Sequence, residues 1–401
     1  MTSFINSSEK TMLKNKNILV GVTGSIAIYK TLEIIRLFIK ARANVRVIMS
    51  EEAKRFITPL TFEAISQNCV LHSQSESWTN ELNHIHIGKW ADIILIAPIT
   101  ANSINKLANG IADNLLTQTI LAFNKQVIIA PSANTNMILN PITKDSLEKL
   151  RKQNFIICEP QNKLLACLDE GTGALAEPQK IFDITARELL KDDFWIDKKV
   201  VVTGGGSVEK IDDVRCITNF SSGKQADALA YAYFLVGADV TLISSKEALH
   251  VEPIIVQSSS EFKSAIESST CRGCYLVMCA AISDFVPKHI TNGKLKKENL
   301  GQEWSLELVK NEDILLNLDK KGMKTIGFKA EIDKNSALKS AKDMLVKKSL
   351  DAVCLNVLES KNSFGSNQNE VTFITKDSDV ALKFASKHEI AKQIVELSKN
   401  I

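Results

Sequence analysis

The sequence lacks the features that would assign it to a membrane, secreted or nucleic-acid-binding class. Its longest apolar stretches, such as segment 93–99, are far too short to span a bilayer. Segment 1–16 has no apolar core between its charges and the first strand, so it does not read as a signal peptide. No basic stripe with interleaved aromatic residues occurs, and 49 basic and 46 acidic residues leave a net charge of +3. We expect a cytoplasmic protein that contacts neither membranes nor nucleic acids.

Cysteine is present, but not in the pattern of a disulfide scaffold or a metal site. Eight cysteines in 401 residues, without a secretion signal, point to a reducing compartment. Cys271 and Cys274 have C-x-x-C spacing without a second pair or nearby histidines, so buried thiols explain them better than zinc or redox chemistry. We predict no metal ion held by a dedicated side-chain cluster.

Strand-length apolar runs alternate with helical patterns along the whole chain. Near-continuous β-branched runs are typical of strands covered on both faces, so the series predicts an α/β fold of two doubly wound domains with largely parallel sheets. A charged segment at 190–198 separates the halves, which predicts one domain at 16–190 and another at 191–401. Residues 1–15 are expected to form a disordered tail before the first strand. Segments 283–300 and 358–369 are expected to be lids or binding loops. The expected strands are 18–22, 45–49, 93–97, 127–130, 155–158, 200–203, 240–244, 276–280, 325–328, 352–356 and 370–375.

Each half opens with a strand and a Gly-rich turn. The turns read GVTGSIA at 21–27 and TGGGSVE at 203–209. Such a turn can bring backbone N–H groups close to a phosphate, but tight strand exits need glycine anyway. The first turn lacks the spacing of G-x-G-x-x-G, and no acid closes the second strand, which argues against a nicotinamide-dependent oxidoreductase. The two turns together predict two nucleotide sites.

Polar side chains in the first half follow strands, where parallel sheets bind ligands. The segment 23–25 forms a phosphate-sized nest, and Asn134 follows the fourth strand. His84 precedes the third strand, and Cys167 lies in a segment whose glycines suggest a mobile flap. Each has a structural explanation when taken singly; Asn134, for example, could satisfy turn backbone. Together, an imidazole, an amide and a thiol around a phosphate nest make an acid/base site plausible.

These motifs, in order, resemble the flavin-containing cysteine decarboxylases, and most closely the phosphopantothenoylcysteine decarboxylases. They are GVTGSIAIYK, HI-x-I with KWAD, AP-x-TAN, ADNLLT, N-x-x-M and AC-x-D-x-G-x-G, over most of residues 17–190. The resemblance implies FMN as cofactor and catalytic roles for His84, Asn134 and Cys167, with Asn134 gripping the substrate carboxylate and Cys167 donating a proton. The residues implied to hold FMN are Gly24, Ser25, Ile26, Ser50, Thr100, Ala101, Asn102, Ser103 and Ser132.

The second half carries anion-binding groups on several loops. Recurring lysines near strand ends suit a triphosphate, although a lysine run is usually a solvated face. The motifs TNF-SSGK, AA-x-SDF, GKLKK, KNEDIL and GFKAE resemble the phosphopantothenate–cysteine ligases over about residues 199–375. This implies CTP with Mg²⁺, and a role for Asn219 in converting the acyl-cytidylate. The residues implied to read CTP are Met278, Cys279, Ala280, Asp284, Lys294, Asn311, Glu312, Asp313, Ile314, Phe328 and Lys348.

The two resemblances imply one bifunctional chain. It would join cysteine to 4′-phosphopantothenate and decarboxylate the product to 4′-phosphopantetheine, as a homo-oligomer built on trimers. Four residues depart from the ligase pattern, from which we expect a weakened rather than a dead ligase: Gln225, Ala226, Met344 and Val357. The alternative is a flavin-binding regulatory protein of the same fold. In the first half, the joint presence of His84, Asn134 and Cys167 argues against a regulatory protein without activity. In the second half, the departures from the ligase pattern leave this alternative open.

Overall fold

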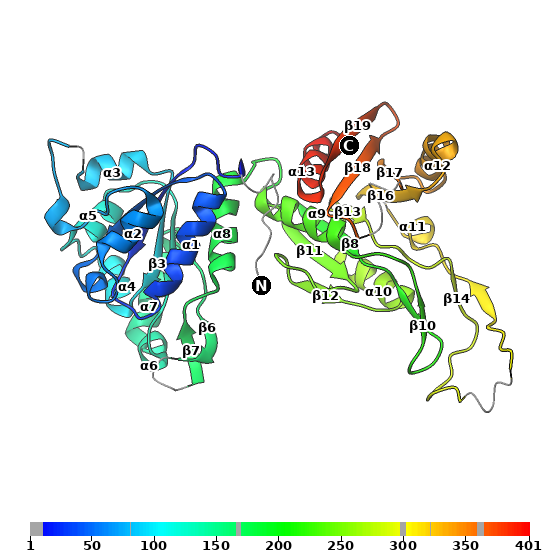
Figure 1. Ribbon diagram of the computed structural model, residues 1–401, viewed down its shortest axis with the longest axis horizontal. Helices are drawn as coiled ribbons and strands as arrows, with labels where there is room; N and C mark the ends of the chain where they lie inside the picture. The colour runs from blue at the N-terminus through cyan, green and yellow to red at the C-terminus, as the bar shows by residue number, and fades with distance from the viewer. Residues whose placement is uncertain (1–10, 81, 166–169, 297–301, 321, 359–364) are drawn as a thin grey trace. The chain divides into compact units, whose positions relative to one another are not determined.

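The computed structural model describes residues 11–80, 82–165, 170–296, 302–320, 322–358 and 365–401. The chain divides into two compact units, unit 1 over Met1–Leu190 and unit 2 over Lys191–Ile401 (Figure 1). Most of the tail expected at 1–15 lies outside the described residues. Residues 11–15, however, form turns in which Leu13 is fully buried and its N–H donates to the Ala41 carbonyl at 2.9 Å, so the tail is shorter than expected. Among the described helices, none is both long and apolar enough to cross a membrane.

Unit 1 is built on a five-stranded parallel sheet in the order β2-β1-β3-β4-β5. The order reverses between β1 and β3, and ligands of open α/β sheets bind outside the carboxyl ends of the strands at such a point. The strands are β1 (Asn17–Val22), β2 (Asn44–Met49), β3 (Ile93–Ile99), β4 (Val127–Pro131) and β5 (Ile156–Ile157).

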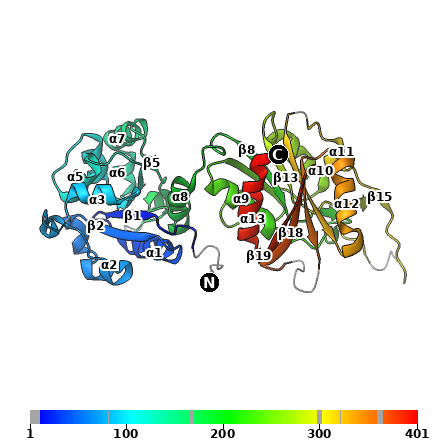
Figure 2. The ribbon, with the colours of Figure 1, turned by 90° about the horizontal axis from the view of Figure 1, so that it is seen from above.

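Helices cover both faces of this sheet (Figure 2). All seven residues of β3 are buried, as expected for a strand packed on both sides. A separate antiparallel hairpin, β6 (Gln161–Leu164) with β7 (Glu170–Ala174), lies outside the main sheet. The helices are α1 (Ile28–Lys40), α2 (Pro59–Ser66), α3 (His84–Trp90), α4 (Ala101–Ala108), α5 (Leu115–Leu121), α6 (Thr135–Leu139), α7 (Pro141–Lys152) and α8 (Pro178–Leu190).

Unit 2 has an eight-stranded sheet in the order β12-β11-β8-β13-β16-β17-β18-β19. The first six strands are parallel, and the last two are antiparallel additions. The parallel strands follow the doubly wound order, with the reversal between β8 and β13. The strands are β8 (Lys199–Gly204), β11 (Asp239–Ser244), β12 (Pro253–Ile255), β13 (Tyr275–Met278), β16 (Lys324–Glu331), β17 (Ala352–Val357), β18 (Gln368–Ile374) and β19 (Asp379–Ser386). The expected α/β class with largely parallel sheets is confirmed in both units.

Two helices pack on one face of this sheet and three on the other, each over its own apolar cluster (Figure 2). Those on the first face are α9 (Lys224–Leu235) and α13 (Lys387–Leu397); those on the second are α10 (Ser259–Ser269), α11 (Ile314–Asn317) and α12 (Lys334–Lys347). The two helix layers leave the carboxyl edge of the parallel strands open for a binding site.

Two hairpins of unit 2 were not expected. β9 (Val208–Lys210) pairs with β10 (Cys216–Thr218), and β14 (Phe285–Pro287) pairs with β15 (Leu308–Lys310). Figure 1 shows the β14 segment extending away from the sheet. The segment expected to be a loop at 283–300 therefore includes a strand, and its residues 297–300 lie outside the described chain, as do residues 359–364 of the second expected loop.

Candidate functional sites

Loops after the strands of unit 1 are tied together at the β1–β3 reversal. Thr23 is buried, and its hydroxyl donates to the Pro98 carbonyl and accepts from the Thr100 N–H, both at 2.9 Å. The Ser25 hydroxyl donates to the Ser132 hydroxyl at 3.3 Å. The segments after β1, β3 and β4 thus form one polar surface, which gathers predicted residues from three separate parts of the sequence.

The N-terminus of α1 begins at this polar surface, where the Ala27 N–H donates to the Ser25 hydroxyl at 3.3 Å. Ala27 caps it without a side-chain hydrogen bond, and its first turn carries no acid. A Cβ on Gly24 would lie 2.7 Å from Cβ of Glu52, so only glycine lets the chain pass here. Helix N-termini with close-lying backbone bind phosphates, so these residues fit the phosphate of a flavin mononucleotide. The neighbouring Ser50 hydroxyl accepts from the Ala53 N–H at 3.4 Å.

The remaining residues expected at the flavin lie on or beside the same loops. Thr100 caps α4, with its hydroxyl accepting from the Ser103 N–H at 3.3 Å. Ala101 and Asn102 form the first turn of this helix. Ile26, in the loop between β1 and α1, is 57% exposed.

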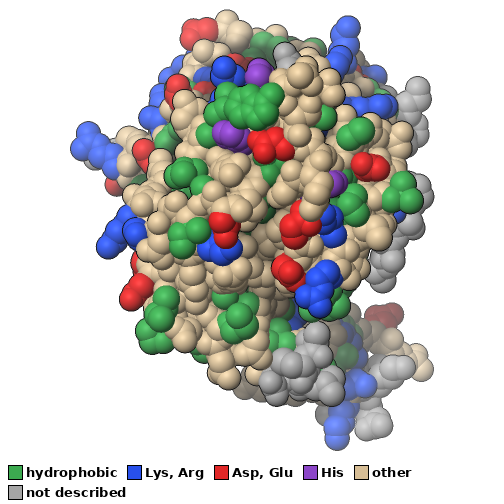
Figure 3. All heavy atoms as spheres, turned by 90° about the vertical axis from the view of Figure 1, so that its left-hand side faces the viewer, with side chains coloured by type: hydrophobic (Ala, Val, Ile, Leu, Met, Phe, Trp, Pro, Cys, Tyr) green, Lys and Arg blue, Asp and Glu red, His purple; other side chains and the backbone are tan. Residues whose placement is uncertain are grey.

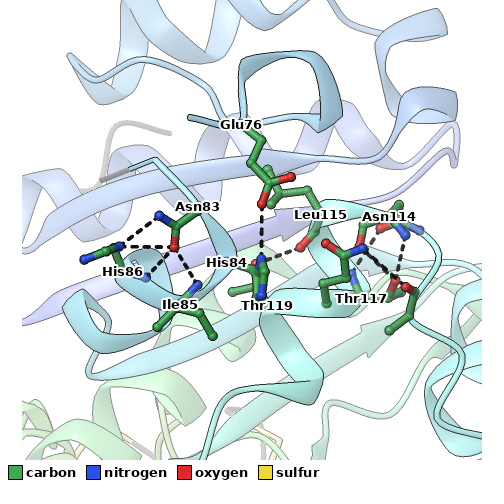
Figure 4. Close-up of polar contacts among 11 residues, drawn as sticks. Glu76, Asn83, His84, Ile85, His86, Asn114, Leu115, Thr117 and Thr119 are labelled. Atoms are coloured by element: carbon green, nitrogen blue, oxygen red, sulfur yellow. Dashed lines mark hydrogen bonds and ion pairs between the residues drawn. The ribbon is translucent and has the colours of Figure 1, made fainter. Parts of the chain in front are cut away.

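His84 is held by the loop that precedes it. Its Nδ1 lies 3.1 Å from Glu76 Oε1, and its ring meets Trp78 edge-on with centroids 5.6 Å apart (Figure 4). The side chain of Asn83 turns instead to His86, with Nδ2 of Asn83 lying 2.9 Å from Nδ1 of His86. Among the described residues, no hydrogen bond connects His84 with the strand-end loops.

Asn134 caps the short helix α6, its side chain accepting from the Asn136 N–H at 2.9 Å. The glycines of β7 lie close to the Asn134 loop, and the mobile flap stays a prediction. A Cβ on Gly171 would lie 2.3 Å from Thr135 Oγ1, and one on Gly173 would lie 2.0 Å from the Ala133 carbonyl oxygen. These glycines allow β7 to pack closely against the Asn134 loop. Cys167 lies outside the described residues.

Unit 2 contains a cavity of about 870 Å³ at the β8–β13 reversal. All the residues expected to act on CTP or the acyl-cytidylate line it, with one exception, and they come from five separate segments. They are Asn219, Met278, Cys279, Ala280, Asp284, Asn311, Glu312, Asp313, Ile314, Phe328 and Lys348. Lys294 is the exception.

Lys294 lies in a segment held by the β9–β10 region. The Asp212 carboxylate accepts from the N–H groups of Arg215 at 2.6 Å and Leu295 at 3.1 Å. It also pairs with the Arg215 guanidinium at 2.6 Å. The neighbouring Gly293 N–H donates to Asp213 at 2.8 Å. The residues on both sides of Lys294 are therefore fixed, and the structure places its side chain away from the cavity lining.

The Gly-rich turn after β8 is shaped by close contacts. Gly205 has φ +79°, and a Cβ there would lie 2.2 Å from Ser245 Oγ. A Cβ on Gly206 would lie 2.7 Å from the Asn219 carbonyl oxygen, and one on Gly204 would lie 2.4 Å from Cβ of Ala226. The Asn219 side chain in turn donates to the Ala281 carbonyl at 3.2 Å. The three glycines thus let the SSGK loop and α9 approach the end of β13.

Charges around the cavity are partly paired. Lys348 binds Asp313 at 2.8 Å, and Lys263 binds Glu312 at 2.8 Å. Burial alone would raise the pKa of Asp313, but the hydrogen bond and charge of Lys348 outweigh it and lower the pKa. Among the described residues, no group of three or more His, Cys, Asp or Glu could hold a metal ion.

One departure from the ligase pattern has a structural role. Gln225 is buried and accepts from the Asn369 side chain at 3.1 Å, which ties α9 to β18. Met344 lines the cavity beside Lys347 and Lys348, so positive charge remains at this end of α12. Lys347 and Lys387 also line the cavity, although neither was expected among the residues at CTP. The Ser386 side chain accepts from the Glu389 N–H and so caps the start of α13. No sequence pattern, however, predicts that this start lies at the unit 2 cavity.

Comparisons with known proteins agree along the whole chain. The Flavoprotein family matches residues 6–190, and the family of the DNA/pantothenate metabolism flavoprotein C-terminal domain matches residues 195–401. The coenzyme A biosynthesis bifunctional protein CoaBC of Borreliella burgdorferi is 37% identical over 96% of this chain and 100% of its own length. That of Bacillus subtilis is 37% identical over 97% and 98%.

Solved structures resemble each half separately. A C-terminal domain of a coenzyme A biosynthesis bifunctional protein CoaBC is 27% identical, covers 52% of this chain and 97% of its own, and has a TM-score of 0.43. The relatives from Borreliella burgdorferi and Bacillus subtilis match both halves of this chain within one protein. The chain therefore belongs to the family of bifunctional coenzyme A biosynthesis proteins, with a flavoprotein half and a pantothenate-metabolism half.

Proposed function

We propose that the chain catalyses two consecutive steps of coenzyme A biosynthesis. Unit 2 would ligate cysteine to 4′-phosphopantothenate with CTP, and unit 1 would decarboxylate the product to 4′-phosphopantetheine with FMN. The observation that carries this proposal is the similarity to bifunctional relatives over 96% of the chain, in which both halves keep their order. The cavity of unit 2, which gathers ten of the eleven residues expected at CTP together with Asn219, supports it.

In unit 2, cations and backbone groups would position the triphosphate against the carboxylate to be activated. Lys348, the N-terminal turn of α11 and Asn219 all line the cavity. Asp284 and Asp343 also line it, and neither has a hydrogen-bond or ion-pair partner for its side chain among the described residues. Carboxylates of this kind suit a Mg²⁺ ion that enters with the nucleotide. The cations would neutralise charge that develops on the phosphates.

In unit 1, the strand-end loops would hold FMN through Gly24, Ser25 and the Thr100 loop. When bound, FMN would supply the thiol oxidation that gives the carboxylate an electron sink and lets carbon dioxide leave. Asn134 would orient the substrate carboxylate from the end of β4, and His84, oriented by Glu76, would act as the acid/base group. Cys167 would donate the proton that completes the product.

We also propose a homo-oligomer with trimeric association of unit 1, in the cytoplasm. Large apolar side chains of unit 1 are exposed, among them Leu60 at 71%, Ile142 at 67% and Leu121 at 65%. Figure 3 shows hydrophobic side chains distributed over the face it presents. Such side chains are suited to burial against another copy. The seven cysteines in the described residues are free thiols, which suits a reducing compartment.

Incubation of the purified protein with 4′-phosphopantothenate, cysteine and CTP, followed by mass analysis, tests the two activities. We expect 4′-phosphopantetheine, CMP and pyrophosphate, and flavin absorbance from the purified protein. Accumulation of 4′-phosphopantothenoylcysteine would contradict the role of unit 1. Absence of any ligated product would contradict that of unit 2. A flavin-bound protein with neither activity would support the regulatory alternative.

A further inference from the structure

A lysine outside every expected motif lies in the wall of the unit 2 cavity. Lys387 is the first residue of α13 and is half-buried. Its N–H donates to the Asn367 carbonyl at 3.1 Å, and its carbonyl accepts from the Gln225 side chain at 3.5 Å. Contacts from both sides thus fix the main chain at Lys387, a residue that lines the cavity.

The ammonium group of Lys387 has no counter-charge in the described chain. It makes no hydrogen bond or ion pair with a described residue, whereas Lys348 has Asp313 and Lys263 has Glu312. The Cys279 thiol lies near enough to act on Lys387, but burial raises the pKa of this thiol to about 12, so it stays neutral at physiological pH. Burial and the charge of Lys224 lower the pKa of Lys387. A partly buried cation without an anion costs free energy, which a bound anion would recover.

A second lysine lies near Lys387 in the cavity lining. The Lys224 ammonium donates to the Gly365 carbonyl at 3.0 Å and to the Asn367 side chain at 2.7 Å. Asn367 therefore contacts Lys224 through its amide oxygen and Lys387 through its backbone. Two like charges are brought together here without a described carboxylate between them. This arrangement suits a ligand with several adjacent negative charges rather than one.

We propose that Lys387 binds the polyphosphate chain of the nucleotide, together with Lys224. The inference rests on the proposed ligase function and adds a phosphate-binding residue to it. Two substrates of the proposed ligase carry phosphate that these lysines could bind. They are the nucleotide, with its polyphosphate chain, and 4′-phosphopantothenate, with a single phosphomonoester. Two converging cations match the di- and triphosphate better than a single phosphomonoester.

Titration calorimetry at fixed ionic strength would test this on the full-length protein with three ligands: CTP, inorganic tripolyphosphate and 4′-phosphopantothenate. Lys387→Gln is expected to weaken CTP and tripolyphosphate binding by about 10- to 100-fold, as for the loss of a charge-assisted hydrogen bond. Binding of 4′-phosphopantothenate should be unchanged. Lys387→Arg should retain most of the affinity. Lys392→Gln, on the same helix but outside the cavity lining, should match the wild type.

Thermal unfolding separates binding from a structural role. Without ligand, Lys387→Gln should unfold at the same temperature as the wild type or a higher one, because a half-buried unpaired charge is removed. A lower melting temperature without ligand would overturn the inference, as would unchanged CTP affinity or a loss confined to 4′-phosphopantothenate. If the wild type bound no CTP, the proposed ligase function would fail, and the tripolyphosphate titration would still decide whether Lys387 is a polyphosphate ligand.

Discussion

Single side chains at both sites depend on one partner for their orientation. His84 meets Glu76 at 3.1 Å, and Lys348 meets Asp313 at 2.8 Å. Removing such a partner leaves the functional group in place but frees its torsions. Loss of orientation therefore lowers a rate less than loss of the group itself.

Substitution of Glu76 tests this for the imidazole. His84→Asn should lower the rate of carbon dioxide release from 4′-phosphopantothenoylcysteine by about 10²- to 10⁴-fold. Glu76→Ala should lower kcat by a smaller factor and leave the melting temperature unchanged. Glu33→Ala, an exposed acid on α1, is the matched control. Equal kcat in Glu76→Ala and the wild type would contradict a positioning role.

Gly173 offers a second test at this scale. It has φ +157°, and a Cβ would lie 2.0 Å from the Ala133 carbonyl oxygen. Gly173→Ala should lower the free energy of unfolding of unit 1 by about 1–3 kcal/mol, because backbone must shift. Gly110→Ala, at φ +68° with no atom within 4 Å of the added Cβ, should cost only about 1 kcal/mol. Chemical denaturation compares the two, and equal losses would rule out the steric explanation.

At the scale of elements, the Asp212 loop holds two hairpins of unit 2 together. Burial alone would raise the pKa of Asp212, but N–H groups of Val214, Leu295 and Arg215 and the Arg215 charge lower it. Because the folded-state pKa lies below the ordinary value of 3.8, the carboxylate stabilises this loop fully above that pH. The stabilisation is lost as the pH falls through the folded-state pKa.

Hydrogen exchange of the Val214, Arg215 and Leu295 amides would measure this effect. Asp212→Asn should speed their exchange at pH 7 by about tenfold, since one or two charge-assisted hydrogen bonds weaken. The wild type and the variant should converge once the pH is well below 3.8. Amides of β8 serve as the internal control. Identical protection at pH 7 would show that the carboxylate does not hold the Lys294 segment.

Periodicity in the sequence predicts the elements that carry long apolar runs, and it fails for short ones. Segment 93–97 and the observed β3 agree because an unbroken buried run has few alternatives. Periodicity does not predict β14 and β15, because most of their residues are exposed. The two strands also pair with each other across some twenty intervening residues. For the sites, ten of the eleven residues that the motif resemblance implies at CTP line the cavity of unit 2. The resemblance does not imply Lys387, whose position depends on how α13 packs against α9 rather than on local sequence.

At the scale of the whole molecule, each unit has its own sheet and its own apolar clusters. A chain of residues 191–401 should therefore fold alone and bind CTP with an affinity within about threefold of the full-length protein. Circular dichroism and calorimetry would check both properties. A fragment with Lys348→Ala, which removes a cavity cation, is the binding control. An unfolded fragment would show that unit 2 depends on unit 1.

The contact between Gly204 and α9 couples two positions that lie far apart in the sequence. A Cβ at 204 would lie 2.4 Å from the Cβ of Ala226, so side chains cannot occupy both positions at once. With alanine at 226, position 204 is closed to any residue larger than glycine. The two positions therefore share room for one methyl group, and a change at Gly204 requires a compensating change at Ala226.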